Sequence, residues 1–174
     1  MELIFPTIEL KQKALEYRQE HFDNHETEIN GDGGLDEANT YEEWLDKIIT
    51  DITRDNDTSL VPATTYFGMH NGEIIGTIQI RHKLNEHLMQ SGGHIGYGIR
   101  PSERRKGYAT QMLKLALDRC REMGIGAVLI TCDKQNTASA KTIIKNGGIF
   151  EDEFVDIHDG NTMQRYWVNL VLQL

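Results

Sequence analysis

The strongest constraint on the fold is an Asn-Gly pair that lies between two runs of β-forming residues. Tyr66-Phe67-Gly68-Met69 precedes Asn71-Gly72, and the run from Ile74 to Ile80 follows it. Asn-Gly flanked by β-forming residues is the strongest short-range signal for a two-residue hairpin, because both central residues of that turn take positive φ. The middle of the chain is therefore predicted to hold an antiparallel pair of strands.

The remaining hydrophobic patterns place helices and further strands around this hairpin. Apolar residues recur at helical spacing in residues 10–22, 41–52, 107–123 and 136–145. Short extended runs, bounded by glycine, proline or polar residues, cover residues 94–99, 127–132, 149–157 and 163–172. This order predicts an α/β (α+β) fold with a mixed, mostly antiparallel central sheet of about 6–7 strands flanked by helices. No stretch rich in proline, glycine or serine divides the 174 residues, so we expect one domain.

The acidic residues are concentrated in the first third of the chain. The formal net charge is −9, and a uniformly negative surface would repel phosphate groups. Residues 1–60, however, hold 16 acidic against 5 basic residues, whereas residues 61–174 hold 11 acidic against 13 basic residues. Any anion-binding site is therefore expected in residues 61–174.

The compartment is predicted from several absences. A membrane helix needs about 20 consecutive apolar residues, and the longest relevant run is Ala127 to Ile130. The first residues have no basic region followed by an apolar stretch and a cleavage site. Cys120 and Cys132 lie in apolar-periodic segments without a CxxC pair, so both are expected to be reduced core residues. We predict a cytoplasmic protein without a membrane partner.

The segment from Gly92 to Thr110 has the pattern of an anion site. A strand candidate with Gly96 and Gly98 stops at Pro101, and the bases Arg104-Arg105-Lys106 precede Gly107 at the start of a long amphipathic helix. A helix N-terminus has unpaired N–H donors and a partial positive charge. The spacing matches neither a Walker loop nor a dinucleotide fingerprint. A solvated surface turn is the alternative, and a nucleic-acid site is disfavoured because the basic run is short and lacks interleaved aromatic residues.

This segment resembles the acyl-CoA-binding signature of the GNAT superfamily of N-acetyltransferases. Residues Arg104 to Ala109 match its pattern [QR]-x-x-G-x-[GA], and the order of elements over about residues 64–172 is similar to that of the superfamily. The resemblance implies one N-acetyltransferase domain, residues 1–174, with splayed central strands. Residues 1–60 would form an acidic helical acceptor-side region and residues 64–172 the acyl-CoA-binding core. The implied activity moves an acetyl group from acetyl-CoA to a primary amine of a small molecule or peptide by direct attack, without a metal.

The resemblance also implies which residues bind coenzyme A. Backbone N–H groups from Arg105 to Thr110 would hold the pyrophosphate, and the backbone of Ile99 and Arg100 would pair with the pantetheine arm. Asn136 would contact the arm as well, although a helix N-cap role is an equal alternative. The predicted cofactor-binding residues are Ile99, Arg100, Arg104, Arg105, Lys106, Gly107, Tyr108, Ala109, Thr110, Asn136 and Ser139.

The predicted catalytic residues are His94 and Tyr166. The resemblance implies a base on the strand before the basic turn, where His94 stands, and a strand-edge structural histidine is the alternative. Many relatives carry a tyrosine that acts as the general acid where this chain has Ile143. Either another group, with Tyr166 and Tyr97 as candidates, or water takes this role here, or protonation of the leaving thiolate matters little. The missing tyrosine also leaves open a non-catalytic acyl-CoA-binding regulatory protein. The acceptor is not identified, and a homodimer is an open alternative to a monomer.

Overall fold

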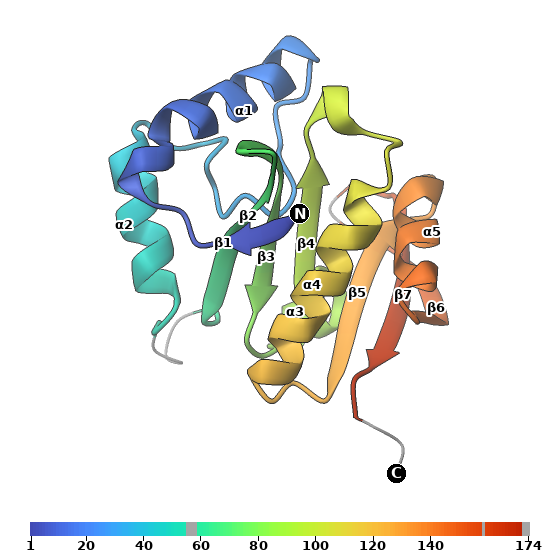
Figure 1. Ribbon diagram of the computed structural model, residues 1–174. Coiled ribbons are helices and arrows are strands. Elements are labelled where there is room, and N and C mark those ends of the chain that lie inside the picture. The colour runs from blue at the N-terminus through green and yellow to red at the C-terminus, as the bar shows by residue number, and fades with distance from the viewer. Residues whose placement is uncertain (55–58, 158, 172–174) are drawn as a thin grey trace.

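The hairpin predicted from Asn71-Gly72 is confirmed. The computed structural model describes residues 1–54, 59–157 and 159–171. Asn71 and Gly72 have φ values of 50° and 78° and connect β2 (Ala63–His70) to β3 (Glu73–Arg81). β1 (Glu2–Ile4) pairs with β2, and β4 (Ile95–Ile99) pairs with β3, each antiparallel. These four strands form one sheet in the order β1-β2-β3-β4 (Figure 1).

A second antiparallel sheet brings the number of described strands to seven. It contains β5 (Ala127–Asp133), β6 (Ile149–Val155) and β7 (Thr162–Asn169) in the order β5-β7-β6. The two sheets meet where β4 lies beside β5, through a single bridge between Gly93 and Ile130. From that junction the two strands diverge towards the basic turn (Figure 1). The mixed α+β fold with splayed central strands is therefore confirmed.

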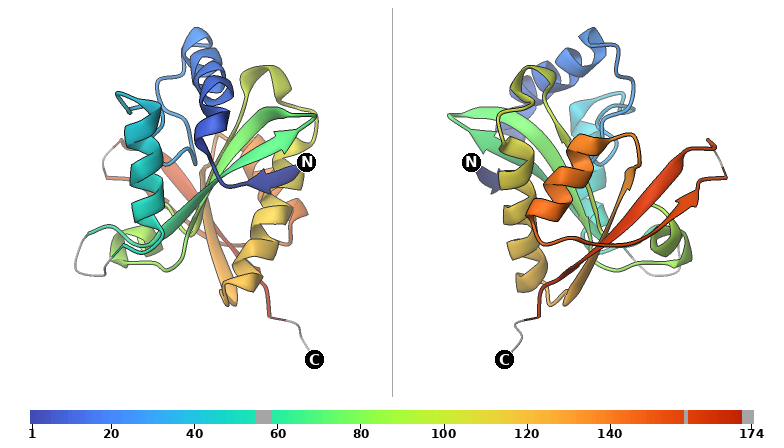
Figure 2. Two further views of the ribbon diagram at one scale, coloured as in Figure 1. Left: turned by 60° about the vertical axis from the view of Figure 1, so that its left-hand side comes forward. Right: turned by 90° about the vertical axis from the view of Figure 1, so that its right-hand side faces the viewer.

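Helices cover both faces of the sheets. α1 (Lys11–Asp23) and α2 (Tyr41–Asp51) lie on one face, and α4 (Tyr108–Glu122) and α5 (Thr137–Lys145) lie on the other (Figure 2). The described residues also form two short 3-10 helices, Ile8–Leu10 and Pro101–Glu103, and the five-residue α3 (Glu86–Gln90). None of the helices in the described residues is both long and apolar enough to cross a membrane.

Each face of the sheets has its own apolar core. On the α4 side, the helical stripe predicted from the sequence is buried against β3, β4, β5 and β7, and its members are Met112, Leu113, Ala116, Leu117 and Cys120. On the α2 side, Trp44 stacks on Phe67 with ring centroids 5.6 Å apart. Burying one such large apolar side chain contributes about 1.5–3 kcal/mol, so these stripes position the helices firmly. Cys120 and Cys132 are buried free thiols, as predicted.

Some local predictions are wrong, and each error has a physical reason. β1 and α3 were not predicted, because three and five residues are too short for a periodic hydrophobic signal. The helical spacing of Ala140, Ile143 and Ile144 predicts that all three point inward, but Ile144 is 55% exposed, since the inward stripe of α5 passes through Thr142 and Ile143. The apolar pattern of residues 41–52 also predicts that this helix ends around residues 55–57, which lie outside the described residues; α2 itself ends at Asp51.

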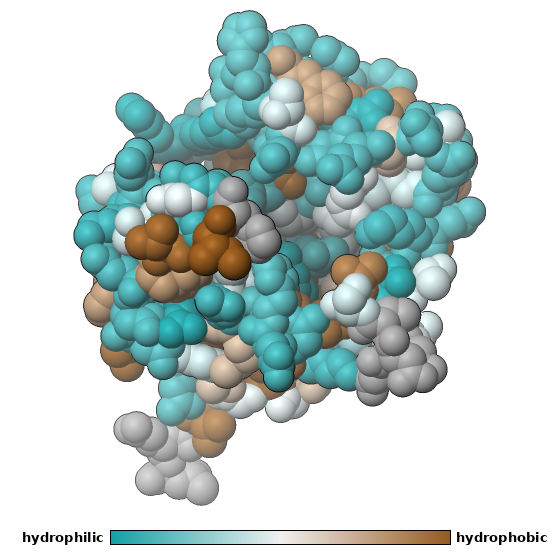
Figure 3. Space-filling view, turned by 180° about the vertical axis from the view of Figure 1, so that it is seen from behind, coloured by the Kyte–Doolittle hydropathy of each residue, from teal (hydrophilic) through white to brown (hydrophobic). Residues whose placement is uncertain are grey.

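The edge strand β6 leaves apolar side chains exposed. Among its residues Ile149 is 70%, Phe150 50% and Val155 61% exposed. The surface seen from behind is largely hydrophilic, with an apolar patch on the side of the molecule where β6 lies (Figure 3). This strand has a neighbour, β7, on one edge only.

Candidate active site

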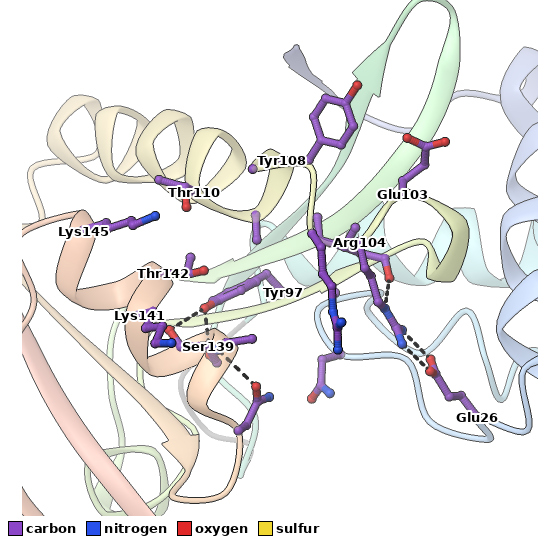
Figure 4. A pocket seen from close by; sticks show the side chains of 18 of the residues that line it. Glu26, Tyr97, Glu103, Arg104, Tyr108, Thr110, Ser139, Lys141, Thr142 and Lys145 are labelled. Atoms are coloured by element: carbon purple, nitrogen blue, oxygen red, sulfur yellow. Dashed lines mark hydrogen bonds and ion pairs between the residues drawn. The ribbon is translucent and has the colours of Figure 1, made fainter.

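A cavity of about 730 Å³ lies between the end of β4 and α5. Its walls come from β4, the basic turn, the first turn of α4, α5 and a loop between α1 and α2 (Figure 4). Nine of the eleven predicted cofactor-binding residues line it, and Arg100 and Lys106 do not. Tyr97 lines it as well, whereas the predicted catalytic residues His94 and Tyr166 lie outside it.

The basic turn has the geometry of an anion cradle. Gly107 caps the N-terminus of α4 with φ 83°, and Arg105 also has a positive φ of 62°. The first hydrogen bond of α4 runs from the N–H of Gln111 to the carbonyl of Gly107 at 3.2 Å. The N–H groups of the residues between them precede the helical ladder and are free to receive an anion. A Cβ on Gly107 would meet no atom within 4 Å, so the left-handed backbone, not a shortage of space within the chain, requires glycine there.

The cations around the cavity fall into two groups. Arg105, Lys141 and Lys145 line the cavity and form no ion pair with any residue that the structure describes. Lys106 instead pairs with Glu103, with 3.0 Å between Nζ and Oε2. The first group therefore supplies positive charge that is available to a phosphate-rich ligand.

Arg104 forms an ion pair with Glu26, so its charge is not available to a ligand as the charges of Arg105, Lys141 and Lys145 are. Its two terminal nitrogens donate to the two carboxylate oxygens of Glu26 at 2.6 and 2.7 Å, and its Nε donates to the carbonyl of Ile99 at 3.0 Å. The guanidinium group lowers the pKa of Glu26 to about 2. Nδ1 of the buried His21 also lies 2.7 Å from this carboxylate. Arg104 thus ties the basic turn to the loop after α1.

The edge of β4 that faces the gap carries backbone groups that do not bond to β3, although the carbonyl of Ile99 accepts the Nε of Arg104. In the register with β3, Gly76 lies opposite Ile99, and the N–H of Arg100 donates to the carbonyl of Ile75 at 2.8 Å. Hydrogen-bonded pairs alternate along an antiparallel ladder, so the N–H and C=O groups of Ile99 and Tyr97 point away from β3. Ile99 is therefore placed as the resemblance implies for a residue that pairs with a cofactor arm.

Arg100 differs from that expectation. Its N–H group is already bonded to β3, and its side chain is bonded to Glu20 of α1, with 2.6 Å between Nε and Oε2. Glu20 also accepts the N–H of Ser102 at 2.8 Å. The prediction that Arg100 binds the cofactor has no support in this geometry, because its polar groups secure the end of β4 to α1.

Asn136 and Ser139 line the cavity at the start of α5. The Oδ1 atom of Asn136 accepts the N–H of Ser139 at 3.0 Å, which is the N-cap alternative considered from the sequence. Its presence in the cavity wall leaves the cofactor contact as a prediction. Oγ of Ser139 lies 2.8 Å from the hydroxyl group of Tyr97, which reaches across from β4 (Figure 4).

His94 lies at the junction of the two sheets. It is 7% exposed, and its Nδ1 accepts the N–H of Leu129 in β5 at 3.0 Å. In the neutral ring Nε2 then carries the only proton, so the ring has no free lone pair for a substrate proton. Burial, together with the neighbouring positive charge of Arg81, lowers the pKa of His94 to about 4. This geometry favours the structural alternative over the predicted catalytic base.

Tyr166 does not line the cavity either. It lies in the middle strand of the second sheet, is 4% exposed, and donates its hydroxyl proton to Oε1 of Gln164 at 2.8 Å. Ile143, at the position where relatives carry tyrosine, is completely buried in the core. Of the two tyrosines considered as replacements, only Tyr97 reaches the cavity.

The sequence analysis missed the loop that carries Glu26, Glu28 and Asn30 into the cavity wall. Gly98 makes this approach feasible, because a Cβ at that position would lie 2.8 Å from the carbonyl oxygen of Asn30. Two glycines inside a strand indicated that something approaches β4 closely. The partner could not be predicted, because the loop lies about 70 residues earlier in the chain. No group of three or more His, Cys, Asp or Glu residues in the described parts of the chain could hold a metal ion.

The sequence matches the acetyltransferase (GNAT) domain family over residues 12–149. The chain belongs to the GNAT acetyltransferase family. No curated protein sequence matches it significantly. The GNAT fold of the chain is similar to solved structures at low sequence identity, which supports the fold alone.

RimJ from Mycobacterium smegmatis, in complex with CoA-disulfide, has a TM-score of 0.72 and 15% identity, over 96% of this chain and 80% of that one. The microcin C7 self-immunity acetyltransferase MccE, in complex with acetyl-CoA and AMP, has a TM-score of 0.68 and 16% identity. The match covers 96% of this chain and 91% of MccE. A variant of the spermidine N-acetyltransferase SpeG from Vibrio cholerae has a TM-score of 0.66 and 12% identity. The match covers 98% of this chain and 95% of SpeG.

Proposed function

We propose that this GNAT acetyltransferase moves an acetyl group from acetyl-CoA to a primary amine of a small molecule or peptide by direct attack. The observation that carries the proposal is the cavity between β4 and α5, which ends at the glycine-capped N-terminus of α4. A long ligand with a phosphate-rich end and an amide-containing arm matches both parts of this cavity. No nucleophilic side chain of the enzyme is required, since an amine attacks a thioester directly.

The chain's residues then divide the work of binding the co-substrate. N–H groups from Arg105 to Thr110 hold the pyrophosphate, and Lys141 and Lys145 add positive charge on the α5 side. The free edge of β4 pairs with the arm through Ile99. A backbone N–H on the same edge donates to the carbonyl oxygen as negative charge develops on it, which is the usual largest single contribution to acyl transfer.

The acceptor is proposed to be a cationic amine. Three carboxylates line the cavity: Glu26 and Glu103 are paired with Arg104 and Lys106, whereas Glu28 is exposed and forms no ion pair with a described residue. An amine with a pKa of about 10.4 is almost wholly protonated at neutral pH, so the acceptor must lose a proton before attack. We assign Glu28 to attract the ammonium group and water to remove the proton.

A thiol-release assay tests the activity directly. Acetyl-CoA is offered with a panel of polyamines, amino acids, aminoglycosides and peptide N-termini, and free thiol is measured against a no-amine blank. Activity on at least one amine is expected, with higher kcat/KM for cationic than for neutral acceptors and a fall in that ratio as salt increases. A neutral acceptor preferred at every salt concentration would contradict the cationic assignment but not the acetyl transfer.

Coenzyme A binding is measured separately from turnover. A ligand at 100 times its Kd stabilises the folded chain by about 2.7 kcal/mol, which corresponds to a rise of about 5–10 °C in melting temperature for a chain of this size. No rise with acetyl-CoA or coenzyme A would contradict the proposed function. A rise without transfer to any amine would favour the non-catalytic regulatory protein, which the buried Ile143 keeps as the second candidate.

The division into an acceptor-side region, residues 1–60, and an acyl-CoA-binding core, residues 64–172, is part of the same proposal. The oligomeric state, a monomer or a homodimer, stays a prediction that light scattering tests.

A further inference from the structure

Tyr97 is the one residue of β4 whose side-chain hydroxyl reaches across the cavity to α5, within the part of the chain that the structure describes. Its hydroxyl lies 2.8 Å from Oγ of Ser139 and 3.5 Å from the carbonyl oxygen of the same residue. The side chain extends from β4 towards the first turn of α5, with the hydroxyl at the cavity wall (Figure 4). The ring packs against the core below, so its direction is fixed by packing.

The position of Tyr97 relative to the basic turn places its hydroxyl near the reactive end of the bound co-substrate. The phosphates lie at the turn from Arg105 to Thr110, and the arm follows the free edge of β4 past Ile99. The next residue with its backbone on that edge is Tyr97, two residues farther from the turn. The reactive end of the arm, which carries the thioester, therefore lies on the Tyr97 side of Ile99. This step rests on the proposed function.

We propose that the Tyr97 hydroxyl donates a hydrogen bond to the thioester sulfur as the carbon–sulfur bond breaks. The amine nitrogen forms its bond to the carbonyl carbon, the electron pair of the carbon–sulfur bond goes to sulfur, and coenzyme A leaves as the thiolate. The amine's surplus proton leaves to water. Ser139 holds the hydroxyl in place before the ligand arrives.

The raised pKa of the Tyr97 hydroxyl agrees with a hydrogen-bond donor that keeps its proton. Burial raises the pKa of Tyr97 to about 12, against about 8.5 for an ordinary thiol. The proton therefore stays on Tyr97 while the hydrogen bond stabilises the charge on sulfur.

The other phenols near this side are less suitable. Tyr108 lines the cavity, but its ring packs on His70, with centroids 5.2 Å apart, and its hydroxyl points away from the cavity (Figure 4). Tyr166 bonds to Gln164 outside the cavity.

The test compares Tyr97→Phe with Tyr66→Phe, a matched loss of one hydroxyl on β2 outside the cavity. With acetyl-CoA and the best amine of the panel, Tyr97→Phe is expected to lower kcat by about 10- to 100-fold, the value of a hydrogen bond to a charged group. KM for acetyl-CoA and the melting-temperature rise with coenzyme A should stay at wild-type values, and Tyr66→Phe should keep the wild-type kcat.

A second measurement changes the leaving group instead of the protein. The selenoester analogue of acetyl-CoA releases a less basic selenolate, which needs less stabilisation. The kcat ratio of wild type to Tyr97→Phe is therefore expected to shrink with this analogue. A ratio that is equal for the thioester and the selenoester would overturn the proposal.

Other outcomes also decide against Tyr97. Retention of kcat within about threefold in Tyr97→Phe, or a kcat loss in Tyr166→Phe instead, would overturn the assignment. Loss of the coenzyme A melting-temperature rise together with kcat would assign Tyr97 a purely structural role and also overturn it. Failure of the proposed function is distinct, because wild-type protein would then release no thiol with any amine.

Discussion

Replacing Glu26 by glutamine should weaken the connection between the loop after α1 and the basic turn, in a pH-dependent way. The Glu26 carboxylate accepts two hydrogen bonds from Arg104, at 2.6 and 2.7 Å, and lies 2.7 Å from Nδ1 of His21. Glutamine has nearly the same shape but no charge. The substitution therefore removes the electrostatic part of the contact and keeps its packing.

The magnitude follows from the pKa of Glu26, which is about 2 instead of the ordinary 4.5. A pKa lowered by that amount corresponds to about 3 kcal/mol of stability at neutral pH. The side chains of Glu26 and Arg104 are 27% and 41% exposed, so water screens the pair and we expect about 1–2 kcal/mol. Because the pKa is lower in the folded state, this stabilisation is complete above about pH 4.5. It is lost as the pH falls towards 2.

Thermal denaturation of wild type and Glu26→Gln at pH 7 and at pH 3 checks this reasoning. At pH 7 the variant should melt about 2–8 °C lower, and at pH 3 the difference should shrink because Glu26 of the unfolded wild-type chain, with its ordinary pKa of 4.5, is protonated there. Glu122→Gln, which removes an exposed charge from α4, serves as the control and should melt like wild type. An equal deficit at both pH values, or no deficit at pH 7, would refute the argument.

Three further predictions follow from the site. Gly107→Ala should weaken coenzyme A binding at least 10-fold by calorimetry, while Gly124→Ala, with a similar φ of 77° at the other end of α4, should cost stability without changing the affinity. His94→Leu should destabilise the fold by about 1–3 kcal/mol, because the Leu129 N–H loses its acceptor, with no change in the pH profile of kcat; a shifted profile would restore His94 as the base. Asn136→Ala should cost about 0.5–2 kcal/mol in urea denaturation and Asn136→Asp almost nothing, and equal costs would argue against the cap.

Local signals were read correctly where neighbouring residues decide the structure. The Asn71-Gly72 turn, the apolar stripe of α4 and the Gly107 cap depend on backbone preference and periodicity within a few residues, and the structure has all three. The anion site at this turn stays a prediction, and its signal is equally local, because a basic turn, a glycine and a helix start are consecutive in the chain.

Predictions that needed a contact between distant residues were less reliable. Arg104, Arg105 and Lys106 look equivalent in the sequence, yet only Arg105 lines the cavity without an ion-pair partner among the described residues. Arg104 is taken by Glu26, 78 positions earlier. His94 had the right position for a base, but its Nδ1 is engaged by a backbone N–H of β5.

The sequence by itself determined an antiparallel hairpin, a glycine-capped helix with a basic turn before it, and an acidic first third, because each depends on residues adjacent in the chain. Only the tertiary structure decided which groups face the cavity. The gap between β4 and β5 frees one edge of β4, the close approach of Asn30 to Gly98 brings carboxylates to its mouth, and packing aims Tyr97 at Ser139. Each of these is a contact between segments that are far apart in the sequence. Packing and hydrogen bonding between those segments determine such contacts, and local backbone preference does not.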